Sequence, residues 1–156
     1  MRLSNIQQNR KTRLIQWAVV LVSISFSPVA GAIDNPESKV VERFKERSRP
    51  YLDSIYSASK SEDGTVQAYY RYERFLDLEL NQVFAALLNN LSGDTRRDLV
   101  TSQKKWLAYR DAEFIFIGSN WIPGNFGSSY RVSKFSYRTN FLENRVIELN
   151  NYLQNY

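Results

Sequence analysis

The sequence contains no histidine and no cysteine among its 156 residues. Histidine is the most frequent general base in enzymes and a common metal ligand, so its absence removes the usual catalytic and metal-binding arrangements. Without cysteine the fold has no disulfide bond, and no lipid can be attached to an N-terminal cysteine, which excludes a lipoprotein. A packed core must therefore hold the fold, and aromatic residues, at 14% of the chain, supply large apolar groups for it.

The first 32 residues contain four basic residues and no acidic ones. A positive stretch at 10–13 precedes an apolar run at 14–28 and the small residues Ala-Gly-Ala at 30–32. This order is typical of a secretory signal, and the run is shorter than the roughly 20 apolar residues that span a bilayer. We expect a cleaved bacterial Sec-type signal peptide over 1–32, with an uncleaved anchor as the alternative. The mature protein would then be periplasmic or secreted, without membrane attachment.

The net charge of +5 comes mostly from this segment, because 17 basic and 16 acidic residues remain when it is removed. The basic pairs at 96–97 and 104–105 are interleaved with Asp94 and Asp98, a pattern typical of a solvated helix face. We therefore expect no nucleic-acid partner.

Helical periodicity of apolar residues predicts four helical segments. They are an N-terminal helix that starts near Pro36 and is broken or kinked at Pro50, then helices at 65–91, 92–117 and 133–153. A polar linker at 57–64 and a glycine-rich loop at 118–130 separate them. No strand-like alternation occurs. The prediction is an all-α bundle with a central antiparallel hairpin of the second and third helices, in which 33–64 form an N-terminal segment and linker and 65–156 the main helical domain.

Some polar residues fall on or beside the apolar faces of these helices. They are Asp77, Asn81, Gln103, Arg110 and Arg145. A buried guanidinium is costly without a carboxylate partner, and Asp77 is the natural partner of Arg110 because their helices are expected to be neighbours. We interpret the set as a structural network that fixes the helix register, with a ligand or partner site as the alternative.

The loop at 118–130 carries the second candidate site. Its candidate partner-binding residues are Trp121, Ile122, Phe126, Ser128 and Tyr130. Aromatic anchors on a loop are typical of protein–protein interfaces. The alternative is that these side chains fold back over the helix ends and close the core.

Catalytic patterns are missing. Asp111 and Glu113, like Asp77 and Glu79, are two residues apart on a helix and point in different directions, unlike the paired carboxylates of a glycosidase. Ser128 has no histidine to activate it. No carboxylate cluster or phosphate-binding glycine loop is present in the required form. We therefore expect no enzyme, no metal and no cofactor.

Several of these residues also form a family pattern. The pattern reads D-x-x-L-N, then Q-x-x-W-x-x-x-R-D-x-x-C, then G-G-S, then T-x-x-R. The matching positions are Asp77, Leu80 and Asn81; Gln103, Trp106, Arg110 and Asp111; Gly127 and Ser128; and Arg145. The sequence resembles the LprI-type lysozyme-inhibitor N-terminal domain over roughly 65–153. Two positions depart from the pattern: Phe114 takes the place of the cysteine and Leu142 that of the threonine. The resemblance implies a divergent, small, exported helical domain in which aromatic packing replaces a disulfide.

We therefore predict an exported, non-enzymatic binding protein that inhibits a lysozyme or another peptidoglycan hydrolase by steric occlusion. The alternative is a structural or accessory module of the cell envelope with no inhibitory activity. Charge weakens the lysozyme assignment, because an acidic inhibitor would be steered to a basic lysozyme and this chain is nearly neutral beyond residue 32.

Overall fold

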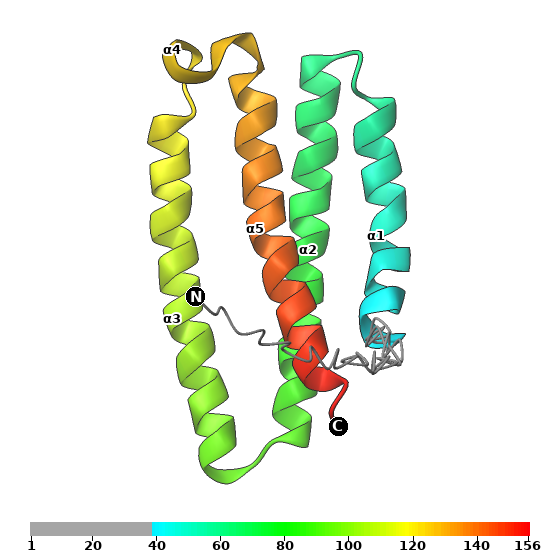
Figure 1. Ribbon diagram of the computed structural model, residues 1–156, viewed down its shortest axis with the longest axis vertical. Coiled ribbons are helices and arrows are strands. Elements are labelled where there is room, and N and C mark those ends of the chain that lie inside the picture. The colour runs from blue at the N-terminus through cyan, green and yellow to red at the C-terminus, as the bar shows by residue number, and fades with distance from the viewer. Residues whose placement is uncertain (1–38) are drawn as a thin grey trace, which may run out of the picture. The chain divides into compact units, whose positions relative to one another are not determined.

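The computed structural model describes residues 39–156, and in that range all regular structure is helical. The elements are α1 Lys39–Ser57, α2 Glu62–Asn90, α3 Gly93–Asn120, the short α4 Pro123–Phe126, the 3₁₀ turn η1 Gly127–Ser129, and α5 Tyr130–Leu153. The four long helices run alongside one another (Figure 1), so the predicted all-α bundle is confirmed. The predicted signal peptide and the predicted helix start at Pro36 lie outside the described residues.

The core is built mainly by α2 and α5. Apolar residues recur on both helices at spacings of three and four, which place them on one face. The buried cluster comprises Tyr72, Leu76, Leu80, Val83 and Leu87 of α2, Leu142, Val146 and Leu149 of α5, and Phe44 of α1. α2 and α5 are the most closely packed pair of the described helices, and α5 lies between α2 and α3 in Figure 1.

This arrangement corrects the predicted core of the bundle. α2 and α3 are joined by a tight connection at Leu91 and Ser92, as expected for a hairpin, but they do not form the central pair. The backbone of α3 approaches that of α5, and only Gln103 and Ile117 of α3 are buried. Sequence neighbours were assumed to be the closest neighbours in space, whereas the longer apolar stripes of α2 and α5 bury more surface against each other.

The N-terminal helix is not broken at Pro50. α1 continues from Lys39 to Ser57 with Pro50 inside it, and it packs on α2 and α5 through Phe44. The predicted linker is also shorter than expected, because α2 already begins at Glu62. Ser61 accepts a hydrogen bond from the backbone N–H of Gly64 at 3.2 Å, and this cap explains the early start.

The predicted long loop at 118–130 is largely helical. α3 continues to Asn120, α4 and η1 follow, and α5 begins at Tyr130. Pro123 occupies the start of α4, where its missing N–H has no helical partner to lose. Gly127 has a φ of 63°, a conformation that favours glycine and turns the chain into α5.

Candidate functional site

Gln103 and Arg145 form a buried polar pair between α3 and α5. Nε and Nη2 of Arg145 donate to Oε1 of Gln103 at 3.2 and 3.0 Å, and the two residues are only 6% and 5% exposed. Nη1 of Arg145 donates to the more exposed Glu148 at 2.7 Å. Burial alone would raise the pKa of Glu148, but hydrogen bonds from Arg145 and Tyr152 outweigh it and lower that pKa. The pair ties α3 to the core helix α5.

Arg110 belongs to a second, more exposed group. Its guanidinium donates to Oδ1 of Asp111 at 2.9 and 2.8 Å, and its Nη1 lies 3.7 Å from Oδ1 of Asp77. Asn81 is exposed on α2, and its side chain makes no hydrogen bond within residues 39–156. The two groups meet at Trp106, whose ring lies 5.9 Å from the Arg110 guanidinium and 5.6 Å from that of Arg145.

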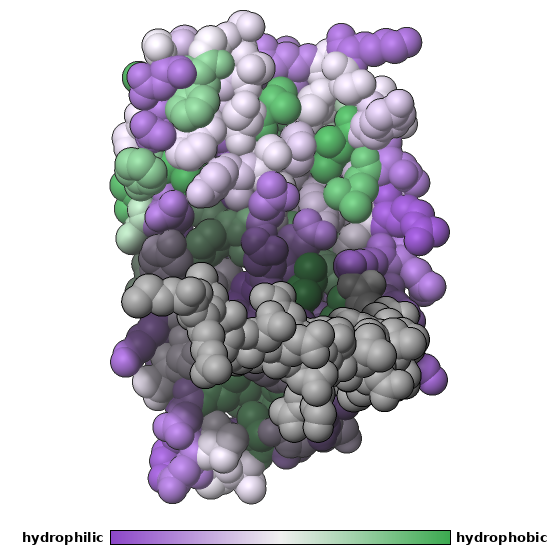
Figure 2. Space-filling view, in the orientation of Figure 1, coloured by the Kyte–Doolittle hydropathy of each residue, from purple (hydrophilic) through white to green (hydrophobic). Residues whose placement is uncertain are grey.

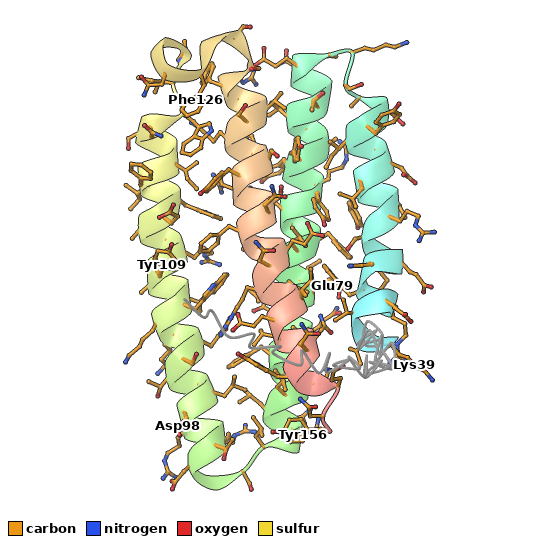
Figure 3. All side chains as sticks on the ribbon, in the orientation of Figure 1. Lys39, Glu79, Asp98, Tyr109, Phe126 and Tyr156 are labelled. Carbon is orange, nitrogen blue, oxygen red and sulfur yellow. The ribbon has the colours of Figure 1, made fainter. Side chains whose placement is uncertain are left out.

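Two further ion pairs were not anticipated from the sequence. Glu73 of α2, only 8% exposed, accepts a hydrogen bond from Arg138 of α5. Glu79 accepts two hydrogen bonds from Arg47 of α1 at 2.8 and 2.6 Å, and Figure 3 labels Glu79 on α2 at the side facing α1. The sequence did contain a signal for buried ion pairs. Arg138 falls beside the apolar face of its helix, and Glu73 and Glu79 lie next to the core residues of α2.

The Glu73–Arg138 pair is incompletely satisfied. Oε2 of Glu73 and Nε of Arg138 are buried and have no hydrogen-bond partner within residues 39–156. Burial raises the pKa of the Glu73 carboxyl, and the charge of Arg138 only partly offsets that effect. The Arg138 guanidinium lies 4.3 Å from the ring centroid of Phe114, and Phe114 in turn meets Phe141 edge-on at 5.9 Å. The residue at the family's cysteine position is therefore packed between a cation and an aromatic ring.

The predicted loop residues lie in three places. Trp121 stacks on Phe126, with ring centroids 4.8 Å apart and planes 4° from parallel. Ser128 lies elsewhere, in a polar pocket of about 350 Å³ shared with the α1–α2 connection. Tyr130 sits at the start of α5, where its ring lies 6.0 Å from Nζ of Lys134.

Two neighbouring rings complete the cluster around Trp121. Tyr137 of α5 lies 5.0 Å from the Trp121 ring and Phe116 of α3 meets it edge-on at 6.5 Å. Neither residue was predicted, because Phe116 lies off the core stripe of its helix and Tyr137 lies outside the expected loop. The signal that could have found Phe116 is that two consecutive large apolar residues, Ile115 and Phe116, cannot both lie on the buried face of one helix.

We call this surface the aromatic end and define it by Phe116, Trp121, Ile122, Phe126 and Tyr137. Apart from the half-buried Trp121, its members are between 39% and 54% exposed. Figure 3 labels Phe126 at this end of the bundle, and Figure 2 shows hydrophobic side chains reaching the surface there among polar ones. Large apolar groups gathered on a surface mark an interaction site more often than scattered ones. The arrangement suits binding, since exposed aromatic side chains offer a large apolar contact area.

The described helices carry neither a metal-binding group of side chains nor a membrane span, within residues 39–156. In that range no group of three or more acidic side chains is placed to hold a metal ion. No helix in the same range is long and apolar enough to cross a membrane.

The sequence profile of the family described as Lysozyme inhibitor LprI matches residues 56–149, which is more than half of the chain. The chain belongs to the LprI lysozyme inhibitor family. The resemblance drawn from the motifs is thereby confirmed, and the chain is a member without cysteine. Neither the curated proteins nor the solved structures gave a match.

The LprI match covers α2 to the last turns of α5, including the Gln103–Arg145 pair and the aromatic end. Most of α1 lies before it, although Phe44 of α1 is part of the same core. At the level of the family, LprI proteins are exported inhibitors rather than enzymes.

Proposed function

We propose that this LprI protein is an exported inhibitor that binds a lysozyme-type peptidoglycan hydrolase through its aromatic end. The observation that carries the proposal is the stacked, half-exposed ring cluster of Trp121 and Phe126, which lies within the region that matches the family. Inhibition would follow from steric occlusion of the hydrolase, without a chemical step by the inhibitor. Export by a cleaved signal at 1–32 is part of the same proposal.

The aromatic end has properties that favour a protein partner. Its rings are positioned by three elements, because Phe116 belongs to α3, Phe126 to α4 and Tyr137 to α5. Contacts among the rings restrain their side chains before binding, which lowers the entropic cost of association. Exposed aromatic anchors of this kind supply much of the binding energy at protein interfaces.

Charge argues for apolar contact rather than electrostatic attraction as the main source of affinity. Beyond residue 32 the chain holds 17 basic and 16 acidic residues, so it has almost no net charge to attract a basic hydrolase. Near the aromatic end, Lys134 donates to the backbone oxygen of Gly118 at 3.4 Å, and the sequence from 114 to 142 contains no acidic residue.

The same charge balance is the observation that favours the second candidate, an accessory module of the envelope without inhibitory activity. In that case the aromatic end would dock on another envelope protein. The two functions differ in one measurement, the rate at which lysozyme lyses bacterial cell walls in the presence of micromolar protein. Slower lysis supports the inhibitor, and unchanged lysis with every lysozyme class tested contradicts it.

The binding surface is tested with Ile122→Asp and Phe126→Ala, which change exposed side chains at the aromatic end. We expect each to weaken inhibition at least about tenfold, as truncation of an interface anchor does. Tyr56→Ala is the matched control, because Tyr56 is an 82% exposed aromatic residue on α1, away from the aromatic end. Inhibition that survives both aromatic-end substitutions, with helix content unchanged by circular dichroism, would place the binding surface elsewhere.

A further inference from the structure

Within residues 39–156, the side of α3 that faces away from α5 is an exposed surface distinct from the aromatic end. Its exposed residues follow helical spacing and are Thr101, Lys104, Ala108, Asp111, Ala112 and Ile115. We call this surface the outer face of α3. Ile115 is 75% exposed there, a large apolar side chain left in water by this arrangement of the chain.

Most of the surface of α3 is not buried against the other described helices. Among the helices described in residues 39–156, its main neighbour is α5, and of its 28 residues only Gln103 and Ile117 are buried. The small side chains of Ala108 and Ala112, four residues apart, would let a second helix approach to the roughly 8 to 10 Å that is usual for helix pairs. A helix of the same length on this face would cover Ile115.

The charges on the outer face of α3 are complementary to those on the same face of a second copy of the chain in antiparallel orientation. Lys104 precedes Ala108 by four residues and Asp111 follows it by three, and both lie on the same flank of the helix. In an antiparallel pair with a two-fold axis near Ala108, Lys104 of each chain therefore faces Asp111 of the partner subunit. Such an interface is isologous, so each ion pair occurs twice.

Both charged groups are available for this pairing. Asp111 receives its two hydrogen bonds from Arg110 on Oδ1 alone, which leaves Oδ2 for another donor. The Lys104 ammonium makes no hydrogen bond or ion pair within residues 39–156. A parallel pair would instead place Lys104 beside the same lysine of its partner, which is repulsive.

We propose that the outer face of α3 is the interface of a homodimer in which two α3 helices pack antiparallel. Ala108 lies at the centre, and Ile115 covers Thr101 of the partner subunit. The antiparallel arrangement directs the two aromatic ends to opposite ends of the dimer, so both remain free to bind. The dimer is independent of the proposed inhibitory function, and neither needs the other.

The interface is small, since two helices in contact over about four turns bury on the order of 1,000 Å² in total, the lower limit for specific association. The test is the molar mass by light scattering of the protein purified after expression of the whole gene, from roughly 1 to 500 µM. We expect the mass of one chain at the lowest concentration and of two chains at the highest. The mass of a single chain throughout would overturn the proposal.

Charge reversal tests the register. Lys104→Asp places two acids opposite each other, and we expect it to abolish the dimer over the same concentrations. Lys104→Asp combined with Asp111→Lys restores opposite charges and should restore the dimer. Lys60→Asp, at an exposed lysine of the α1–α2 connection, is the control and should remain dimeric. A dimer that survives Lys104→Asp, or one that the double substitution fails to restore while helix content is normal, would overturn the antiparallel α3 interface.

Discussion

Gln103 accepts two hydrogen bonds from the Arg145 guanidinium through a single oxygen, in a site where both residues are almost inaccessible to water. α3 has little other buried surface, so this pair is a principal polar link between α3 and the core helix α5. The neutral Gln103 acceptor satisfies two donors of the buried guanidinium, and Glu148 accepts from the third nitrogen, Nη1, at 2.7 Å.

Gln103→Leu should lower the free energy of unfolding by about 2 to 3 kcal/mol, because it removes both acceptor contacts of a buried charge. The measurement is urea denaturation followed by circular dichroism. Asn81→Leu is the comparison, since Asn81 belongs to the same predicted set but is exposed, and it should change stability by less than about 0.5 kcal/mol. Equal effects of the two substitutions would mean that the buried pair has no special role in stability.

Arg110→Leu should cost less than Gln103→Leu. The Arg110 side chain is 23% exposed, and its partners Asp77 and Asp111 are 47% and 64% exposed, so water screens both ion pairs. We expect a loss of about 1 kcal/mol or less in the same urea experiment. A loss larger than that of Gln103→Leu would show that the Asp77–Arg110 contact, and not the buried amide, holds α2 and α3 in register.

Tyr72 should make the protein sensitive to alkaline pH. Tyr72 is 1% exposed, and its hydroxyl has no hydrogen-bond partner in the described part of the chain. Burial, reinforced by the charge of Glu143, raises the pKa of this hydroxyl well above its usual value. The unfolded chain therefore loses the proton from about pH 10, whereas the folded chain keeps it, and the free energy of unfolding falls as the pH rises further.

Tyr72→Phe tests this relationship directly, since it removes the ionisable hydroxyl and keeps the ring. We expect stability at pH 7 to be unchanged or higher by up to about 1 kcal/mol, because an unsatisfied buried group is lost. The decline above about pH 10 should become shallower in urea denaturation. An equally steep decline in the variant would assign the alkaline sensitivity to other groups.

Glu73 should also make the free energy of unfolding fall as the pH rises, but in the acidic range. Because burial raises its pKa in the folded state, the unfolded chain releases the proton first as the pH rises from about 4. This residue therefore lowers the free energy of unfolding between about pH 4 and its raised folded-state pKa. Glu73→Gln should gain stability relative to the wild type as the pH rises through this range. A stability difference that does not vary with pH would contradict the buried, uncompensated carboxyl.

The strongest periodic signals in the sequence predicted the structure well. The spacing of Leu76, Leu80, Val83 and Leu87 defines the buried face of α2 as observed. Helix ends were less predictable, because Pro50 continues a helix and Pro123 begins one, although proline reads as a helix breaker in both places. Which helices pack together depends on the total apolar surface of each pair, and this cannot be judged from one helix at a time.

The sequence indicated several residues of the candidate sites, but it did not indicate which of them lie together in space. Gln103 and Arg145 are 42 residues apart, and only the placement of α5 between α2 and α3 brings them together. Phe116 and Tyr137 joined Trp121 for the same reason, since α3 and α5 converge on α4 at that end. α3 and α5 both carry apolar residues in the core and apolar residues at the surface. Periodicity alone does not distinguish the buried apolar residues from the exposed ones.

Phe114 and Phe116 offer a last comparison between a packed and an exposed ring on the same helix. Phe114 contacts the Arg138 guanidinium at 4.3 Å and the Phe141 ring at 5.9 Å, whereas Phe116 is 54% exposed. Phe114→Ala should lower the free energy of unfolding by about 2 kcal/mol, and Phe116→Ala by less than about 1 kcal/mol. Urea denaturation measures both. If Phe114→Ala costs no more than Phe116→Ala, the ring at the family's cysteine position does not stabilise the fold, and aromatic packing has not replaced a disulfide there.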